Sequence, residues 1–93
     1  MRESVVEKAL VKRVKELGGI AEKFTSPNKV GVPDRLCLFP EGKLCFVECK
    51  APGERVTALQ NYDHEIRRKL GFAVYVIDSI EAAEAFNHGG IRR

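Results

Sequence analysis

The chain has 93 residues, of which 44% are hydrophobic and 31% are charged, with a formal net charge of +3. A single core is usually built from roughly 50 to 200 residues, so we expect one domain over residues 1–93. The composition is typical of a globular protein and excludes a disordered chain. The longest apolar run, Phe72 to Ile77, falls far short of the about 20 residues of a membrane helix.

The start of the chain and the cysteines indicate the cellular compartment. Met1 to Ser4 lacks the apolar segment of a secretory signal, so we expect a cytoplasmic protein with no membrane partner. The cysteines Cys37, Cys45 and Cys49 match neither a disulfide framework nor the paired C-x-x-C spacing of a zinc site. We interpret them as reduced core residues.

The first third of the chain predicts a helix, a strand and a loop. Apolar residues recur at helical spacing over Ser4 to Leu17, with Ser4 as the N-cap and Gly18-Gly19 as the stop. Ile20 to Phe24 alternates apolar and polar residues like a half-buried strand. Thr25 to Pro33 has turn residues and no period, which is typical of a loop.

The middle of the chain predicts a β-hairpin. Arg35 to Phe39 and Leu44 to Lys50 read as strands, and the turn Pro40 to Lys43 carries Pro and Gly where a hairpin needs them. We expect the two strands to pair antiparallel.

The last third predicts a helix, a strand and a short helix. Thr57 caps a helix that reaches Leu70 and ends at Gly71. The apolar run Phe72 to Ile77 predicts a strand that is buried on both faces. A short helix over Ser79 to Phe86 follows. The order αβββαβα predicts an α/β fold in which helices flank a mixed β-sheet.

Three charged residues predict a metal site. Glu48 and Lys50 lie two apart on a strand, so both side chains point to one face. The hairpin register can bring Asp34, at the start of the preceding strand, beside Glu48. Two carboxylates suit Mg²⁺ or Mn²⁺, which take further ligands from phosphate oxygens, so a phosphodiester substrate fits. Lys50 could orient the attacking water, help to remove its proton, or neutralise transition-state charge.

A purely structural interpretation is also open. An E-x-K pattern on a strand is often a surface ion-pair ladder, and Asp after Pro is often a turn residue. Against it, the apolar Leu36 and Phe46 share the face or flank of these charges. Charges on a core face usually need a partner or a metal.

These residues resemble the VRR-Nuc (virus-type replication-repair nuclease) domains of the PD-(D/E)xK superfamily. The resemblance is carried by Gly31 to Asp34, Phe46 to Gly53 and Gln60. It implies a restriction-endonuclease-like α/β core and a metal-dependent DNA endonuclease. The implied metal ligands are Asp34, Glu48 and the backbone carbonyl of Cys49, and Lys50 is the implied catalytic lysine.

The resemblance also implies a glutamate of the first helix near the metal. Glu7 is preferred to Glu3 because it lies inside the predicted helix. Alternatively, Glu7 forms a capping box with Ser4. Gln60 is implied to be an active-site residue, although Thr57 to Gln60 also matches a capping box.

Other polar residues give weaker signals. We interpret His64 and His88 as solvent-facing or merely packed, and Asp63 and Glu65 as an exposed helical face. Lys29, in the loop, could touch a phosphate, but loop lysines are usually only solvated.

Basic residues gather in three stretches, which suggests a phosphate-binding surface, although solvated helix faces would explain them equally well. They are Lys8, Lys12, Arg13 and Lys15, then Arg67, Arg68 and Lys69, and last Arg92 and Arg93. Among these, Lys8, Lys12, Lys15, Arg67 and Arg68 are the expected DNA contacts.

The resemblance implies a homodimer that resolves four-way (Holliday) junctions, because a twofold dimer matches the approximate symmetry of such DNA. Apolar residues near Phe86 and Ile91 are candidates for its interface. The alternatives are a non-catalytic module that binds DNA structures and a monomeric nuclease that cuts flaps or single strands.

Overall fold

The computed structural model describes residues 1–90. The helices and strands follow one another as α1 (Glu3–Glu16), β1 (Ile20–Lys23), β2 (Arg35–Leu38), β3 (Leu44–Cys49), α2 (Ala58–Lys69), β4 (Ala73–Ile77) and α3 (Ile80–Ala85). Short 3-10 turns lie at Pro40–Gly42 and His88–Gly90. The predicted order αβββαβα is confirmed, and every predicted boundary lies within one residue of the observed one. Within residues 1–90, no helix has the length and apolar character needed to cross a membrane.

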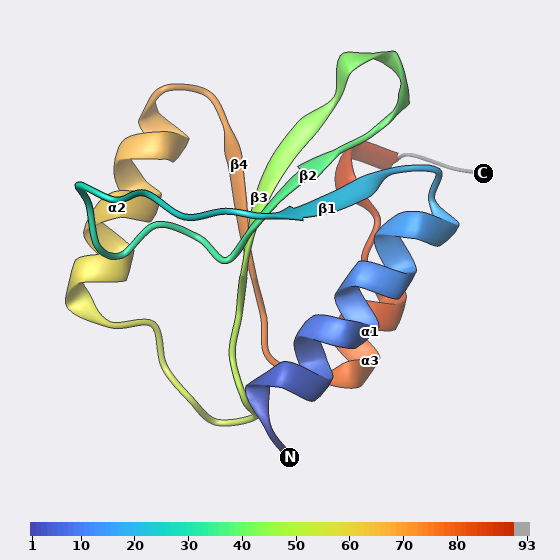
Figure 1. Ribbon diagram of the computed structural model, residues 1–93, viewed down its shortest axis with the longest axis horizontal. Helices are drawn as coiled ribbons and strands as arrows, with labels where there is room; N and C mark the ends of the chain where they lie inside the picture. The colour runs from blue at the N-terminus through green and yellow to red at the C-terminus, as the bar shows by residue number, and fades with distance from the viewer. Residues whose placement is uncertain (91–93) are drawn as a thin grey trace.

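The sheet has the strand order β1-β2-β3-β4. β1, β2 and β3 pair antiparallel, as the hairpin turn predicts, whereas β3 and β4 pair parallel. A parallel pair needs a crossover, and α2 supplies it. Helix α2 lies on one side of the sheet, and α1 and α3 lie together on the other (Figure 1). The fold is therefore a mixed sheet between helical layers, which is the predicted α/β class.

Strand β3 separates the core from the polar face because its side chains alternate. Cys45, Val47 and Cys49 are buried in the hydrophobic cluster that α1 and α3 complete. Phe46 and Glu48 point instead toward α2. All three cysteines are buried free thiols in the described chain, as predicted. The face that carries Glu48 is thus shared with a helix rather than with the apolar core.

Two sequence predictions about packing are wrong. Helix α1 starts one residue earlier than predicted, so Arg2 is the N-cap and Ser4 lies inside the first turn. β4 is not buried on both faces, because it is the last strand of the sheet and Val76 is 41% exposed. The apolar run thus has one face that packs against the core and one face that is partly exposed.

The loop between β1 and β2 is held against α2 by two contacts. The Nζ atom of Lys29 lies 3.2 Å from Oδ1 of the buried Asp63. Gly31 has a φ of +87°, and an added Cβ there would lie 2.9 Å from the carbonyl oxygen of Leu59. The loop therefore needs glycine both for its backbone conformation and for its close approach to the first turn of α2.

A stacked arginine of α2 also contributes to the packing between this loop and the helix. The guanidinium carbon of Arg67 lies 5.0 Å from the ring centroid of Phe24 and 4.7 Å from that of Phe46. Its Nε donates to Oδ2 of Asp63 at 2.7 Å. Burial disfavours the ionised Asp63, yet the hydrogen bonds from Arg67 and Lys29 keep its pKa below the usual value. These contacts join the end of β1, the loop and α2 into one support.

We predict that Gly31→Ala destabilises the protein more than Gly42→Ala. Both residues have positive φ, which costs an alanine about 1–2 kcal/mol. No described atom lies within 4 Å of an added Cβ at Gly42. At Gly31 the clash with backbone should add about 1–3 kcal/mol. Urea unfolding of both variants measures the difference, and equal losses would mean that the loop does not pack tightly on α2.

Candidate active site

Two carboxylates meet beside the end of β3. Arg35 pairs with Val47, so Asp34 stands next to Glu48 across the hairpin. Oδ2 of Asp34 accepts a hydrogen bond from the backbone N–H of Cys49 at 2.8 Å. The Glu48 side chain is almost completely buried. The structure thus brings together the two carboxylates that the sequence predicts as a pair.

The electrostatics of this pair oppose ionisation of Glu48. Burial first and the charge of Asp34 second raise the pKa of the Glu48 carboxyl to about 8, against the opposing effect of Lys50. The side chain is held in place although its charged form is costly. Such a carboxylate favours any cation that can reach it.

Lys50 is the nearest positive charge. Its Nζ lies 3.8 Å from Oε2 of Glu48, and its side chain is buried. The backbone N–H of Lys50 donates to the carbonyl of Ile77, which extends the β3–β4 ladder past the last strand residue. The ammonium is therefore anchored on rigid backbone beside the carboxylates.

Gln60 forms the predicted capping box and also contacts Glu48. Its Oε1 accepts from the Thr57 backbone N–H at 2.9 Å, and the Thr57 hydroxyl accepts from the Gln60 backbone N–H, which completes the capping box. Its Nε2 donates to Oε2 of Glu48 at 3.2 Å. The cap fixes which end of the amide is oxygen, so the NH₂ group faces the carboxylate.

The preference for Glu7 over Glu3 is not supported by the structure. The Glu7 carboxylate accepts from Arg35 Nε at 2.7 Å and lies 3.7 Å from Lys23 Nζ. Both partners carry positive charge, so Glu7 is neutralised by its own ion pairs. It also makes no capping box with Ser4, which is not the N-cap.

Glu3 is affected by the charge of Asp34, while Glu7 contributes, after burial and Asp34, to the raised pKa of the Cys49 thiol. Burial raises the pKa of Glu3, and the charges of Asp34 and Glu54 raise it further. Glu3 in turn contributes to the raised pKa of Glu48. Sequence reasoning discounted Glu3 as part of a frayed end, but the helix already begins at this residue.

Two polar residues of α2 are almost completely buried. Asp63 is 1% exposed, whereas an exposed helical face was expected, and His64, also 1% exposed, takes the packed alternative of its prediction but lies against a site residue. Nε2 of His64 lies 3.4 Å from Oε1 of Glu48. Their spacing places His64 on one helix face with Gln60, and Asp63 on one face with Arg67, but it does not reveal that they are buried.

The expected DNA contacts divide into two groups. Arg67 is committed to Asp63 and the aromatic rings, and Arg68 donates to Glu65 and to the Val74 carbonyl. These contacts use part of both guanidinium groups, while Arg68 remains exposed, so contact of either residue with DNA stays a prediction.

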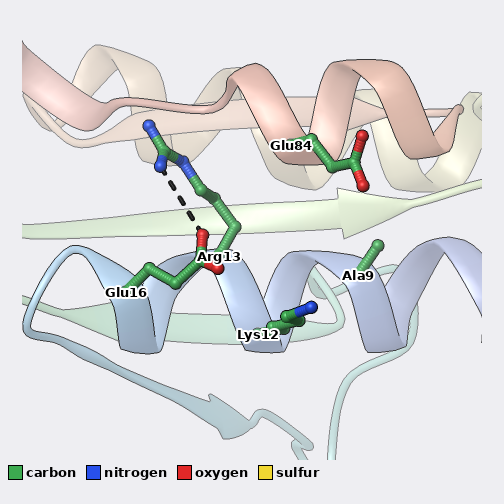
Figure 2. Close-up of a pocket in the computed structure, with 5 residues that line it drawn as sticks. All are labelled: Ala9, Lys12, Arg13, Glu16 and Glu84. Atoms are coloured by element: carbon green, nitrogen blue, oxygen red, sulfur yellow. Dashed lines mark ion pairs between the residues drawn. The ribbon is translucent and has the colours of Figure 1, made fainter.

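The lysines of α1 are exposed: Lys8, Lys12 and Lys15. Lys12 lines a pocket of about 250 Å³ between α1 and α3, where Arg13 and Glu16 pair at 3.6 Å (Figure 2). This pocket belongs to the helical layer opposite α2. It is thus separate from the carboxylates, which face α2. Of the third basic stretch, Arg92 and Arg93 lie outside the described residues.

The residues of the site fit a divalent cation. Oε1 of Glu48 is buried and has no hydrogen-bond partner among residues 1–90. An orphaned carboxylate oxygen next to a second carboxylate is a hard-oxygen donor set of the kind that Mg²⁺ and Mn²⁺ prefer. Within the same residues no three His, Cys, Asp or Glu side chains form a ready metal cluster. The fit therefore rests on two carboxylates and needs further oxygen ligands from backbone, water or substrate.

We predict that Glu48→Gln stabilises the metal-free protein at pH 8 but not at pH 5. The Glu48 carboxyl has an ordinary pKa near 4.5 and a folded pKa of about 8. Between these values the folded state holds a proton that the unfolded chain has lost, so stability falls as the pH rises. Glutamine removes this loss. Melting curves in EDTA test this, with the exposed Glu81→Gln as the control. A parallel decline in both variants would contradict it.

Known proteins resemble this chain in sequence and in fold. A protein of Acyrthosiphon pisum secondary endosymbiont phage 1, named "Putative nuclease p44", is 53% identical over 79 residues, which cover 85% of each protein. A solved structure described as "VRR_NUC domain" shares a TM-score of 0.84 and 32% identity, and the match covers 88% of this chain and 89% of that one. No model of a known protein family matches the sequence. With a restriction-endonuclease-like α/β fold and these relatives, the chain belongs to the VRR-Nuc family.

Proposed function

We propose that this protein is a DNA endonuclease that hydrolyses phosphodiester bonds with Mg²⁺ or Mn²⁺. The observation that carries the proposal is the buried Glu48 carboxylate beside Asp34, with the Lys50 ammonium 3.8 Å from its Oε2. The VRR-Nuc relatives, one of which is named as a nuclease, support the reaction class. These relatives support nuclease activity in general, and the residues of the site suggest how phosphodiester hydrolysis would proceed.

Asp34 and Glu48 would hold the cation, together with the backbone carbonyl of Cys49. The Cys49 peptide is already tied to this place, because its N–H donates to Asp34. When bound, a divalent cation polarises a phosphate oxygen and lowers the pKa of a coordinated water. Glu3 is the further acidic residue whose charge reaches this group, and it replaces Glu7 in the proposal.

Lys50 stabilises charge in this scheme. An ammonium group has three N–H donors and no acceptor. Held by the β3–β4 ladder, it can donate to a phosphate oxygen that gains charge in the transition state, or to the oxygen of the attacking water. Gln60 contributes by fixing Oε2 of Glu48, so that the carboxylate does not turn away.

We predict that Lys50→Ala lowers the single-turnover cleavage rate on the order of 10²- to 10³-fold while Mn²⁺ binding stays near wild type. Lys50 acts on the transition state, whereas the carboxylates bind the cation. Asp34→Asn should lose both properties.

Lys43→Ala, an exposed lysine of the hairpin turn, is the matched control for charge removal. Cleavage by Lys50→Ala at the wild-type rate would contradict the assignment. A wild-type protein that shifts DNA in EDTA and never cuts it with Mg²⁺ would instead be a non-catalytic binding module.

The exposed face of α1 is the proposed phosphate-binding surface. Lys8, Lys12 and Lys15 follow one another at spacings of four and three residues, so they form one stripe along the helix. The stripe starts five residues after Glu3, whose pKa is raised by burial and by the charge of Asp34. Binding through these lysines should weaken steeply as salt rises.

The proposed substrate is a four-way junction, cut by a homodimer. A domain of this size offers little surface to a branched DNA, whereas a twofold dimer doubles it and presents two symmetric sites. Of the expected interface residues, Phe86 is buried in the core, so it cannot serve as an exposed contact. Ile91 lies outside the described residues.

We predict a dimer in solution that makes paired, symmetric nicks near the branch point. Light scattering at micromolar protein measures the mass, and end-labelled junctions map both cuts. A monomer, or cuts at unrelated positions, would contradict the junction-resolving dimer and favour a monomeric flap or single-strand nuclease. Either result leaves the nuclease proposal intact.

A further inference from the structure

His64 is buried against the proposed metal ligand without a completed hydrogen bond. Its side chain is 1% exposed, and its Nε2 lies 3.4 Å from Oε1 of Glu48. The two groups are not oriented for a hydrogen bond. Neither atom has another hydrogen-bond partner in the described part of the chain. Two buried polar atoms that face each other in this way each carry a desolvation cost.

The opposite oxygen of the same carboxylate is already held. Gln60 Nε2 donates to Oε2 of Glu48 at 3.2 Å. Gln60 and His64 are four residues apart on α2, so one helix face presents both nitrogens to one carboxylate. A small rotation of either side chain would complete the contact of His64 with Oε1.

We propose that His64 is a positioning residue that donates through Nε2–H to Oε1 of Glu48. With Gln60 on Oε2, α2 then fixes the plane of the carboxylate. Each carboxylate oxygen has two lone pairs, so both oxygens keep one for another ligand. The role in cation binding rests on the proposed function, whereas the contact itself does not.

The contact is tested in the metal-free protein. NMR spectra are recorded at pH 9, because an ionised carboxylate has no proton and can only accept a hydrogen bond. Long-range ¹H–¹⁵N spectra of the labelled protein should show His64 protonated at Nε2 and not at Nδ1. The opposite tautomer would overturn the proposal, because a bare Nε2 would then face the carboxylate. This measurement needs no activity.

The role in cation binding is tested by calorimetric titration with Mn²⁺. Removal of such a supporting partner typically weakens metal binding about 10- to 100-fold, which we expect for His64→Phe. His64→Gln, whose amide nitrogen can occupy the place of Nε2, should stay within about threefold of wild type.

The matched control is His88→Phe. His88 packs on Phe39 and its Nδ1 lies 2.9 Å from the Tyr75 hydroxyl, so it contacts the other layer of the protein. Wild-type Mn²⁺ affinity in folded His64→Phe would overturn the positioning role, as would equal weakening in His64→Gln and His64→Phe. If His64→Phe does not fold, the glutamine variant and the tautomer decide. A wild-type protein without Mn²⁺ binding or cleavage would refute the proposed function, while the tautomer still tests the contact.

Discussion

A carboxylate buried beside another carboxylate is the constraint on which this site depends. Glu48 is almost fully out of water, and its nearest cation, Lys50, is 3.8 Å away from one oxygen only. Without its surroundings such a side chain would rotate toward solvent. The protein instead holds it on a central strand between β2 and β4 and supplies donors from a helix. In the proposed site, a bound cation would offset the cost of removing this carboxylate from water.

Helix α2 organises the site although it has almost no apolar buried face. Its buried residues are Asp63 and His64, and its capping residue Gln60 donates to Glu48. Asp63 binds Arg67 and Lys29, which connects the helix to the loop that leads into Asp34. A polar network therefore joins the elements that carry the two carboxylates. Such networks specify one arrangement when all their members are satisfied.

The two faces of the sheet have different roles: one carries the hydrophobic core and the other carries the candidate site. The core with α1 and α3 takes the cysteines and aliphatic side chains, while the face toward α2 takes Glu48. Glu7 and Glu3, one turn apart on α1, have different neighbours. Glu7 reaches Arg35 on the core-facing side of β2, whereas Glu3 lies close enough to Asp34 to raise its own pKa.

The sequence predicted the fold well because its local signals agree with one another. Glycine stops, a capping box and apolar periods mark almost every boundary, and the spacing of Glu48 and Lys50 requires that they share a face. The roles of Arg67 and His64 could not be predicted in this way. They depend on Phe24 and Glu48, residues distant in sequence that only the tertiary fold brings to α2. Polar residues on a predicted helix look solvated until such partners are known.

Anomalous scattering from crystals grown with Mn²⁺ would test the central claim most directly. The account predicts one strong manganese peak within bonding distance, about 2.0–2.6 Å, of carboxylate oxygens of both Asp34 and Glu48. The Gln60 amide should remain on Glu48 in the same crystal. A manganese ion bound elsewhere, or by neither of these carboxylates at saturating Mn²⁺, would contradict the account.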